Sequence, residues 1–470
     1  MSEIHQSFLS KNSTLLLNTV PCYYKLKSRP LLFRTLDESA RICTYMRCAG
    51  CVSCCVNFAL AHIDYRILLT LYQRLLNLKK ISILYGNNLK FIEQTNVLIT
   101  NNTFQKIHSK IKPAKHKVVD CDGLLLIPGL INSHTHLGDS IAKDIALDKD
   151  PDSKINPIFG IKQKILKETK PSKLIHYMRK TVKSMLKKGI TTFVDFRESG
   201  LDGVLLMQKA LSNIPIRSIV LGRIEYYQSK EQIKKNTPIP QSYQNQIDIL
   251  LKNCDGIGIS GSNENSDSSL KQFSKTKKIR AIHCAETKQS YLKSKQTTRK
   301  TEPKRSMLLK PDFLVHMTYA SKSDLNIASK KTRGIVVCPR ANASLAEGIP
   351  NVVEMMEMNC NVAIGTDNVM INSPDLFREM DFLWKITMGI HQKRVEPKSI
   401  LKMATVNAGK ILDKKIGCIK EGYLADAVFI KKNDLDLDPL RNPHASIVHR
   451  TNENSIQAVM IGGDIVHGKI

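Results

Sequence analysis

The chain has 470 residues, of which 42% are hydrophobic and 24% charged, which is typical of a soluble globular protein large enough for a sizeable core. Its formal net charge is +29 at pH 7, from 71 lysine and arginine residues against 42 acidic ones. The excess lysine is spread widely, without interleaved aromatic residues or a recognisable nucleic-acid module. We therefore expect a solvated basic surface and no nucleic-acid partner, and contact with an anion or nucleic acid is the less favoured alternative.

Residues 1–78 form an extension that differs from the rest of the chain. Six of the 12 cysteines lie before residue 56, in part as the cluster Cys48, Cys51, Cys54 and Cys55. A structural zinc site would need a separated second ligand pair, which is missing, so a poorly ordered extension ending in a helix at residues 58–80 is favoured. The polar start after Met1 does not resemble a signal peptide, and the apolar stretch 48–63 is too short to span a membrane. We expect a cytoplasmic protein without membrane association.

From residue 79 onward the pattern becomes regular. Short apolar runs with Asn and Asp-Gly turns predict a small β module at residues 79–126. Eight strand candidates follow, separated mostly by amphipathic stretches, at residues 126–134, 190–196, 216–224, 256–261, 279–285, 313–319, 334–339 and 361–367. Eight strand–helix units in about 250 residues suit a (β/α)8 TIM barrel, placed here at residues 127–413 with a helical end from residue 397. Short strands in residues 414–470 then rejoin the first β module.

Ligand-type side chains fall at the ends of several of these strands. His134 and His136 end the first strand, His283 ends the fifth, His316 lies in the sixth, and Asp367 ends the eighth. Residues two apart in a strand point to one face, so His134 and His136 can converge on one ion. Since the carboxyl ends of barrel strands meet at one rim, neutral imidazoles and a carboxylate there predict a catalytic zinc or iron site with an open position.

The motifs PGLINSHTH, HCAET, VH and GTDN, with ATVNAGKIL and IGCIKEGYLADAVFI further on, resemble the amidohydrolase superfamily. The nearest branch contains methylthioadenosine/S-adenosylhomocysteine deaminases, guanine and cytosine deaminases and triazine hydrolases. The resemblance covers residues 79–470. It implies an α/β fold in which the barrel carries a β-sandwich built from both flanking segments, and it implies homodimers or larger assemblies.

The same resemblance implies the roles of individual residues. His134, His136, His283 and Asp367 would bind one divalent metal ion, with zinc favoured and iron the alternative. Glu286 would shuttle protons, His316 would orient the attacking water, and Asp367 would take a proton from it. Binuclear relatives need a bridging lysine at the fourth strand, and residues 255–269 contain none, so a single metal ion is expected.

Four more residues at strand ends are candidates for substrate binding. Arg197 and Glu198 follow the second strand, and Arg340 and Asn342 follow the seventh. Each is also a common residue type in structural ion pairs and turns, which is the alternative reading.

The expected reaction is hydrolytic deamination of a nitrogen heterocycle. Residues 137–170 lack the aromatic, acidic-lined segment with which adenosine-type relatives bind ribose, so a free base, a pterin-like ring or a phosphorylated heterocycle stays open. The alternatives are hydrolysis of a cyclic amide or halide by the same site, and an inactive barrel that serves as a basic binding scaffold.

Overall fold

The computed structural model describes residues 76–111 and 117–470, all within one compact unit that spans residues 73–470. The cysteine cluster and most of the helix expected at residues 58–80 lie outside the described residues. Residues 76–80 of that expected helix begin strand β1 (Leu76–Tyr85), because they pair with the antiparallel strand β2 (Lys90–Thr100), so the helix prediction is wrong there. No helix within the described ranges is long and apolar enough to cross a membrane.

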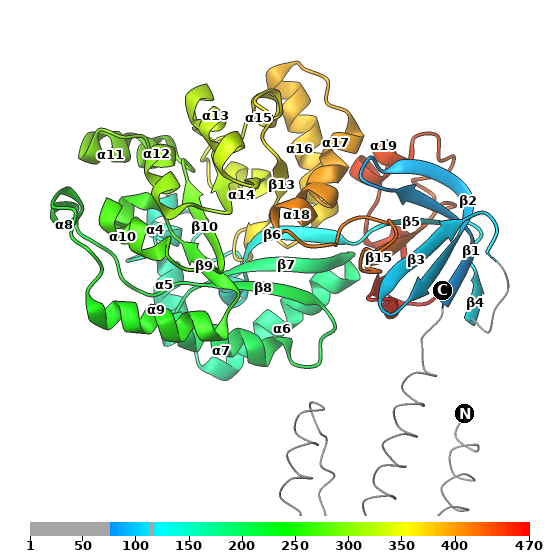
Figure 1. The fold of residues 1–470 in the computed structure, drawn as a ribbon, viewed down its shortest axis with the longest axis horizontal. Coiled ribbons are helices and arrows are strands. Elements are labelled where there is room, and N and C mark those ends of the chain that lie inside the picture. The colour runs from blue at the N-terminus through cyan, green and yellow to red at the C-terminus, as the bar shows by residue number, and fades with distance from the viewer. Residues whose placement is uncertain (1–75, 112–116) are drawn as a thin grey trace, which may run out of the picture. The chain divides into compact units, whose positions relative to one another are not determined.

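A curled sheet of parallel strands forms the larger part of this unit (Figure 1). Its strands in chain order are β6 (Leu130–His136), β7 (Ile190–Arg197), β8 (Arg217–Gly222), β9 (Gly256–Ile259), β10 (Ile279–Cys284), β11 (Phe313–His316), β12 (Gly334–Val337), β13 (Val362–Ile364) and β14 (Asp367–Asn368). Strand β13 pairs with β12, whereas β14 pairs with β6. Only Gly365 and Thr366 separate β13 from β14, so one stretch of chain carries both edges of the sheet, which therefore curls round on itself.

The strands lie where the sequence predicts them, but several end earlier. The strand expected at residues 313–319 ends at His316, because His316 and Met317 have φ angles of 70° and 56°, outside the β region. The strand expected at residues 126–134 is two strands that belong to different sheets, β5 (Leu124–Pro128) and β6. Gly129 joins them where a Cβ atom would lie 2.3 Å from the Thr191 hydroxyl oxygen.

Helices connect the parallel strands and cover the curled sheet (Figure 1). They are α4 (Pro151–Ile155), α5 (Ile161–Glu168), α6 (Pro171–Lys187), α7 (Gly200–Leu211), α8 (Lys230–Lys234), α9 (Gln241–Asn253), α10 (Asp267–Phe273), α11 (Lys288–Thr298), α12 (Glu302–Ser306), α13 (Lys322–Lys331), α14 (Pro339–Ser344), α15 (Val352–Glu357), α16 (Leu376–His391), α17 (Pro397–Met403) and α18 (Val406–Ile411). Helix α6 shows why they form: Pro171 opens its first turn, and Leu174, Met178, Val182 and Met185 recur at helical spacing and are buried.

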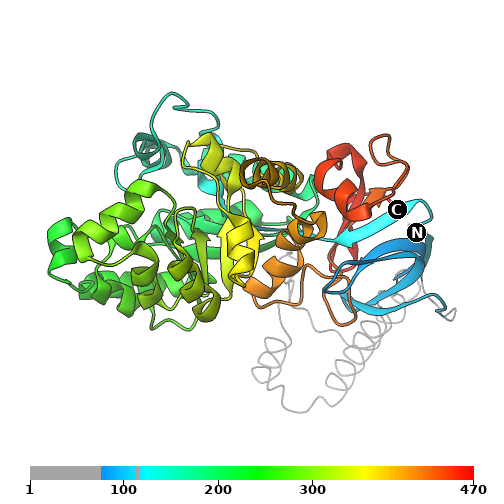
Figure 2. The ribbon, with the colours of Figure 1, turned by 90° about the horizontal axis from the view of Figure 1, so that it is seen from above.

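A second sheet combines both flanks of the curled sheet. Its order is β17-β16-β15-β5-β1-β2-β3, and β4 also pairs with β1. The additional strands are β3 (Thr103–His108), β4 (Lys117–Asp120), β15 (Ala427–Lys431), β16 (Ile456–Ile461) and β17 (Asp464–Gly468), and helix α19 (Pro443–His449) lies between β15 and β16 in sequence. Figure 2 shows the blue and cyan strands beside the red C-terminal segment, as the rejoining of the two flanks predicts. Leu78, Phe104 and Phe429 belong to a separate hydrophobic core, which is formed largely by strands of this sheet.

Candidate active site and metal centre

Four ligand-type side chains meet at the carboxyl ends of the strands. His134 and His136 come from β6, His283 from β10 and Asp367 from the start of β14, and one donor atom of each lies within 4.8 Å of the others. All four are buried. Gly365 lets the last strand pass His134 closely, since a Cβ atom there would lie 2.6 Å from the Cβ atom of His134. These are the four residues in which the sequence predicts metal ligands.

The donor atoms fit a metal ion better than they fit one another. The Nε2 atoms of His136 and His283 face each other at 3.2 Å, and the Nε2 atom of His134 is buried without a hydrogen-bond partner among the described residues, 3.2 Å from Asp367 Oδ1. Burial lowers the pKa of His134 to about 3, against the opposing effect of Asp367. Burial, followed by the neighbouring histidines, also holds the pKa of His283 well below its ordinary value. Neutral imidazoles that converge with a carboxylate are the donor set that zinc takes.

Acceptors behind the imidazoles orient the rings of His136 and His283. The Nδ1 atom of His136 lies 2.8 Å from Glu198 Oε1 and 3.1 Å from the carbonyl oxygen of Phe196. The Nδ1 atom of His283 lies 3.0 Å from the carbonyl oxygen of Ile259. Because these acceptors need a proton on Nδ1, each ring turns the lone pair of Nε2 toward the centre.

A second group of side chains lies beside the first and shares Asp367 with it. His316 Nε2 lies 3.3 Å from Glu286 Oε1, and one donor atom each of Glu286, His316 and Asp367 lies within 4.8 Å of the others. His316 and Asp367 both adopt positive φ angles, 70° and 60°, a conformation that non-glycine residues keep at functional sites only when their surroundings impose it. This group can pass a proton from one carboxylate to the other.

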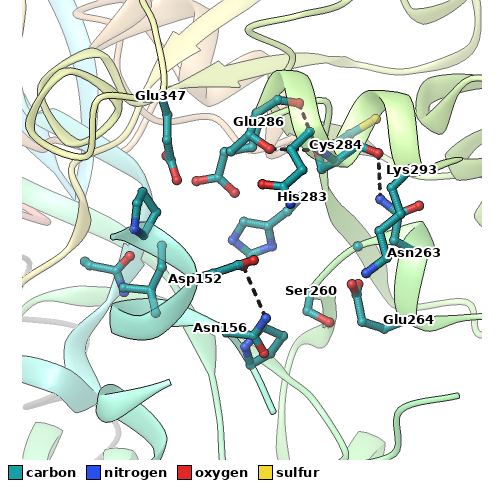
Figure 3. A pocket seen from close by; sticks show the side chains of 18 of the residues that line it. Asp152, Asn156, Ser260, Asn263, Glu264, His283, Cys284, Glu286, Lys293 and Glu347 are labelled. Carbon is teal, nitrogen blue, oxygen red and sulfur yellow. Dashed lines mark hydrogen bonds between the residues drawn. The ribbon is translucent and has the colours of Figure 1, made fainter. Parts of the chain in front are cut away.

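A cavity of about 600 Å³ opens onto these residues, which is a size suited to a small molecule. Strand ends supply His136, His283 and Asp367, while one wall comes from the segment around α4 and α5. Figure 3 shows His283 between two ends of the cavity, with Glu347 and Glu286 at one and Glu264 and Lys293 at the other. The cavity therefore has an acidic end close to the candidate metal ligands and a mixed-charge end beyond them.

Arg197 and Glu198, in which the sequence predicts substrate contacts, lie behind the cavity wall rather than on it. Glu198 is 1% exposed and binds Arg197 at 2.5 Å and Lys162 at 2.6 Å, as well as His136. Burial alone would raise the pKa of Glu198, but Lys162, Arg197 and His136 together hold it well below its ordinary value. The carboxylate orients His136 and the two cations keep it charged, whereas substrate contact by Arg197 and Glu198 stays a prediction.

Arg340 and Asn342 are likewise absent from the cavity lining that the structure describes. Arg340 Nη1 lies 3.3 Å from Oε1 of Glu379, a fully buried carboxyl group. Asn342 is fully buried, and its Oδ1 atom lies 3.2 Å from His316 Nδ1. Arg340 thus contacts a buried carboxyl group and Asn342 orients His316, and substrate contact by these two residues stays a prediction.

Two residues of this site were missed from the sequence. Lys162 lies in the lysine-rich helix α5. It is buried and paired with Glu198, but nothing in the local sequence distinguishes it from the exposed lysines of that helix. Glu347 lines the cavity from the loop between α14 and α15. Its only signal is an acidic residue before Gly348, shortly after the strand end at residues 334–337.

Comparisons with known proteins identify a matching family model, similar chains and a similar fold. The model of the amidohydrolase family matches residues 125–466. The chain is similar to a protein of Methanothermobacter thermautotrophicus described as a "Putative aminohydrolase", with 32% identity over 80% of this chain and 94% of the relative. It is also similar to the 5-methylthioadenosine/S-adenosylhomocysteine deaminase of Thermococcus sibiricus, with 27% identity over 82% and 92% of the two chains. The crystal structure of a Xanthomonas campestris adenosine deaminase with bound zinc shares the fold, with a TM-score of 0.71 at 18% identity over 83% and 92% of the chains.

Proposed function

The chain belongs to the amidohydrolase family, and we propose that it is a metal-dependent deaminase that removes an amino group from a nitrogen heterocycle by hydrolysis. The meeting of three histidines and Asp367 within 4.8 Å at the end of a cavity carries this proposal. The names of the relatives support the reaction, since those reported above are described as an aminohydrolase and as deaminases.

The metal proposed here is a single divalent ion held by His134, His136, His283 and Asp367. The neutral imidazoles suit zinc or iron, and zinc is favoured because a structure of the same fold contains zinc. When bound, the ion supplies an activated water molecule that is nucleophilic near neutral pH.

The remaining chemistry is assigned to side chains. His316, oriented by Asn342, positions the attacking water, and Asp367 takes a proton from it. Glu286 moves a proton to the ring nitrogen next to the carbon under attack. That carbon gains oxygen from water, the amino group takes up the proton that left the water, its bond to the carbon breaks, and ammonia leaves. The cavity of about 600 Å³ has room for a nucleobase, a nucleoside or a related ring.

Purified protein would test this function directly. We expect one equivalent of metal per chain and release of ammonia from at least one member of a panel of purines, pyrimidines, pterins and adenosine derivatives. Glu286→Gln should retain the metal and lose roughly 100- to 10,000-fold in kcat. The exposed Glu357, paired with Lys393, provides a matched Glu→Gln control remote from the cavity. Full activity of Glu286→Gln would remove the proton shuttle from the proposal.

Finer features of fold and setting belong to the same proposal. We infer that the curled sheet is a complete (β/α)8 barrel and that the second sheet folds into a small β-sandwich, because β13 and β14 carry both edges of the first and one core fills the second. A reducing cytoplasm suits the unpaired, buried cysteines of the described residues. A homodimer or larger assembly follows from family resemblance and is testable by light scattering.

A further inference from the structure

Glu347 is an acidic side chain in the cavity wall, and the proposed chemistry assigns no role to it. It is 5% exposed, and its Oε2 atom is buried without a hydrogen-bond partner in the part of the chain that the structure describes. A buried carboxyl oxygen without a donor is costly, because the water it loses on folding is not replaced. The cavity is the direction from which a donor can reach it, since Glu347 is one of the residues that line it.

The backbone around Glu347 is shaped to present this side chain. Ala346 has a φ angle of 56°, which is rare for alanine and persists where neighbouring structure imposes it. The N–H group of Glu347 donates to the carbonyl oxygen of Asn342 at 2.8 Å, which ties the loop to helix α14. The position of Glu347 is therefore built into the loop between α14 and α15.

Glu347 and Glu286 face each other at the acidic end of the cavity (Figure 3). Burial raises the pKa of Glu347 to about 11, and the charge of Glu286 and a hydrogen bond with it act in the same direction. The Oε2 atom of Glu347 is buried and has no donor among the described residues, so it can accept a hydrogen bond from a group that enters the cavity.

The position of Glu286 indicates which part of a substrate Glu347 would meet. In the proposed function, on which this inference rests, Glu286 serves the ring nitrogen next to the carbon that loses its amino group. Glu347, which faces Glu286, therefore contacts the substituent on the other carbon that is bonded to that nitrogen. We propose that Glu347 is a specificity-determining residue that accepts a hydrogen bond from an N–H group there. The substrate class is a diamino-type heterocycle, in which one ring nitrogen lies between the reacting carbon and a second carbon that bears an N–H donor.

Two matched pairs of probes isolate that second N–H group: 2,6-diaminopurine against adenine, and 2,4-diaminopyrimidine against 4-aminopyrimidine. Each pair is to be compared by kcat/KM for ammonia release and by calorimetric affinity. The metal-loaded full chain should favour the diamino member of at least one pair by ~10- to 100-fold in both measurements.

Variants of Glu347 separate its acceptor from its charge. Glu347→Ala should bring the ratio within each pair close to one. Glu347→Gln should keep most of the preference, because the amide still offers a carbonyl oxygen to the substrate and can donate its NH₂ group to Glu286. Glu357→Ala is the control: it removes an exposed acid remote from the cavity and should leave the ratio unchanged.

The possible results distinguish a failure of this inference from a failure of the proposed function. Ammonia release with no preference for diamino rings, or with a preference that survives in Glu347→Ala or is lost in Glu357→Ala, would overturn the role of Glu347 and leave the deaminase standing. Preferential binding of diamino rings that is lost in Glu347→Ala, without ammonia release from any probe, would support the role of Glu347 and count against the deaminase. If the protein shows no binding preference and releases no ammonia, both proposals are contradicted.

Discussion

One carboxylate oxygen of Glu198 lies 2.8 Å from the Nδ1 atom of His136, and Lys162 Nζ approaches the same oxygen at 2.6 Å. Arg197 binds the other oxygen, so a single buried carboxylate ties together two cations and a candidate metal ligand. Such an acceptor fixes which imidazole nitrogen carries the proton and which presents a lone pair. In the proposed function, the metal affinity of His136 is thus set partly by Glu198, which is not one of the four proposed ligands.

Replacing Glu198 with glutamine should weaken metal binding by roughly 10- to 100-fold, because the oriented, charged acceptor behind His136 is lost. Competition with a chromophoric chelator would measure the affinity, and circular dichroism would verify that the variant is folded. Glu225→Gln serves as control, since Glu225 is partly exposed, pairs with Lys167 at 3.6 Å and does not belong to the ligand group. A folded Glu198→Gln with unchanged metal affinity would mean that His136 does not depend on this contact.

Asn342 has the corresponding relationship with His316. Its fully buried Oδ1 atom lies 3.2 Å from His316 Nδ1, so we expect Asn342→Ala to free the ring and lower kcat by roughly 10- to 100-fold. Metal content should stay at the wild-type value, because His316 is outside the four-residue ligand group. Metal analysis beside steady-state kinetics measures both effects. A variant that loses its metal along with its activity would place His316 among the ligands instead.

The meeting of the four candidate ligands was predictable from sequence, because strand order brings them together. Parallel strands bring their carboxyl ends together, so histidines at the ends of the first and fifth strands and an aspartate after the eighth must come close. The two-residue spacing of His134 and His136 adds the shared face. No tertiary detail beyond the order of the strands is needed for this inference.

The residues around that group were not predictable in the same way. Glu198 and Asn342 stand at strand ends as a substrate-binding residue would, and only side-chain direction shows that each turns toward a histidine. Glu347 enters the cavity because Ala346 adopts a left-handed conformation, which the sequence does not predict. The early end of β11 has a similar cause, since the positive φ angles at His316 and Met317 depend on surrounding contacts.

Glu379 should make stability depend on pH. Burial raises its pKa from an ordinary 4.5 to about 8, although Arg340 opposes the shift. A carboxyl with a raised pKa in the folded state binds its proton more tightly there than in the unfolded chain. Its stabilising effect is therefore complete below about pH 4.5 and is lost as the pH rises through about 8. Glu379→Gln should reduce the fall in unfolding free energy across this window.

Urea unfolding at several pH values between about 5 and 8 would measure this effect. Glu357→Gln is the matched control, because the hydrogen bond from Lys393 lowers the pKa of Glu357 and moves its titration below the window. Parallel pH profiles of Glu379→Gln and the unaltered protein would show that Glu379 titrates equally in the folded and unfolded states.

Arg217 and Asp426 form an ion pair, and replacing one partner should reduce the free energy of unfolding more than replacing the other. Arg217, in β8, places Nε 2.6 Å and Nη2 3.0 Å from the two oxygens of Asp426, which precedes β15 in the second sheet. Asp426 is 1% exposed, whereas the Arg217 side chain is 33% exposed. Arg217→Ala leaves a buried carboxylate without its cation and should cost about 3 kcal/mol in unfolding free energy. Asp426→Asn should cost about 1 kcal/mol, because the guanidinium can turn to water and the amide oxygen can still accept from Gly462 N–H.

Both variants can be measured by urea unfolding against Asp381→Asn, which breaks an exposed pair with Lys385 and should cost less than about 0.5 kcal/mol. Metal content should be unaffected in all three, since none of these residues belongs to the ligand group. Equal losses for Arg217→Ala and Asp426→Asn would show that the contact acts as a symmetric surface pair. The buried position of Asp426 argues for the larger loss on removal of the arginine, because the folded protein cannot rehydrate the carboxylate left behind.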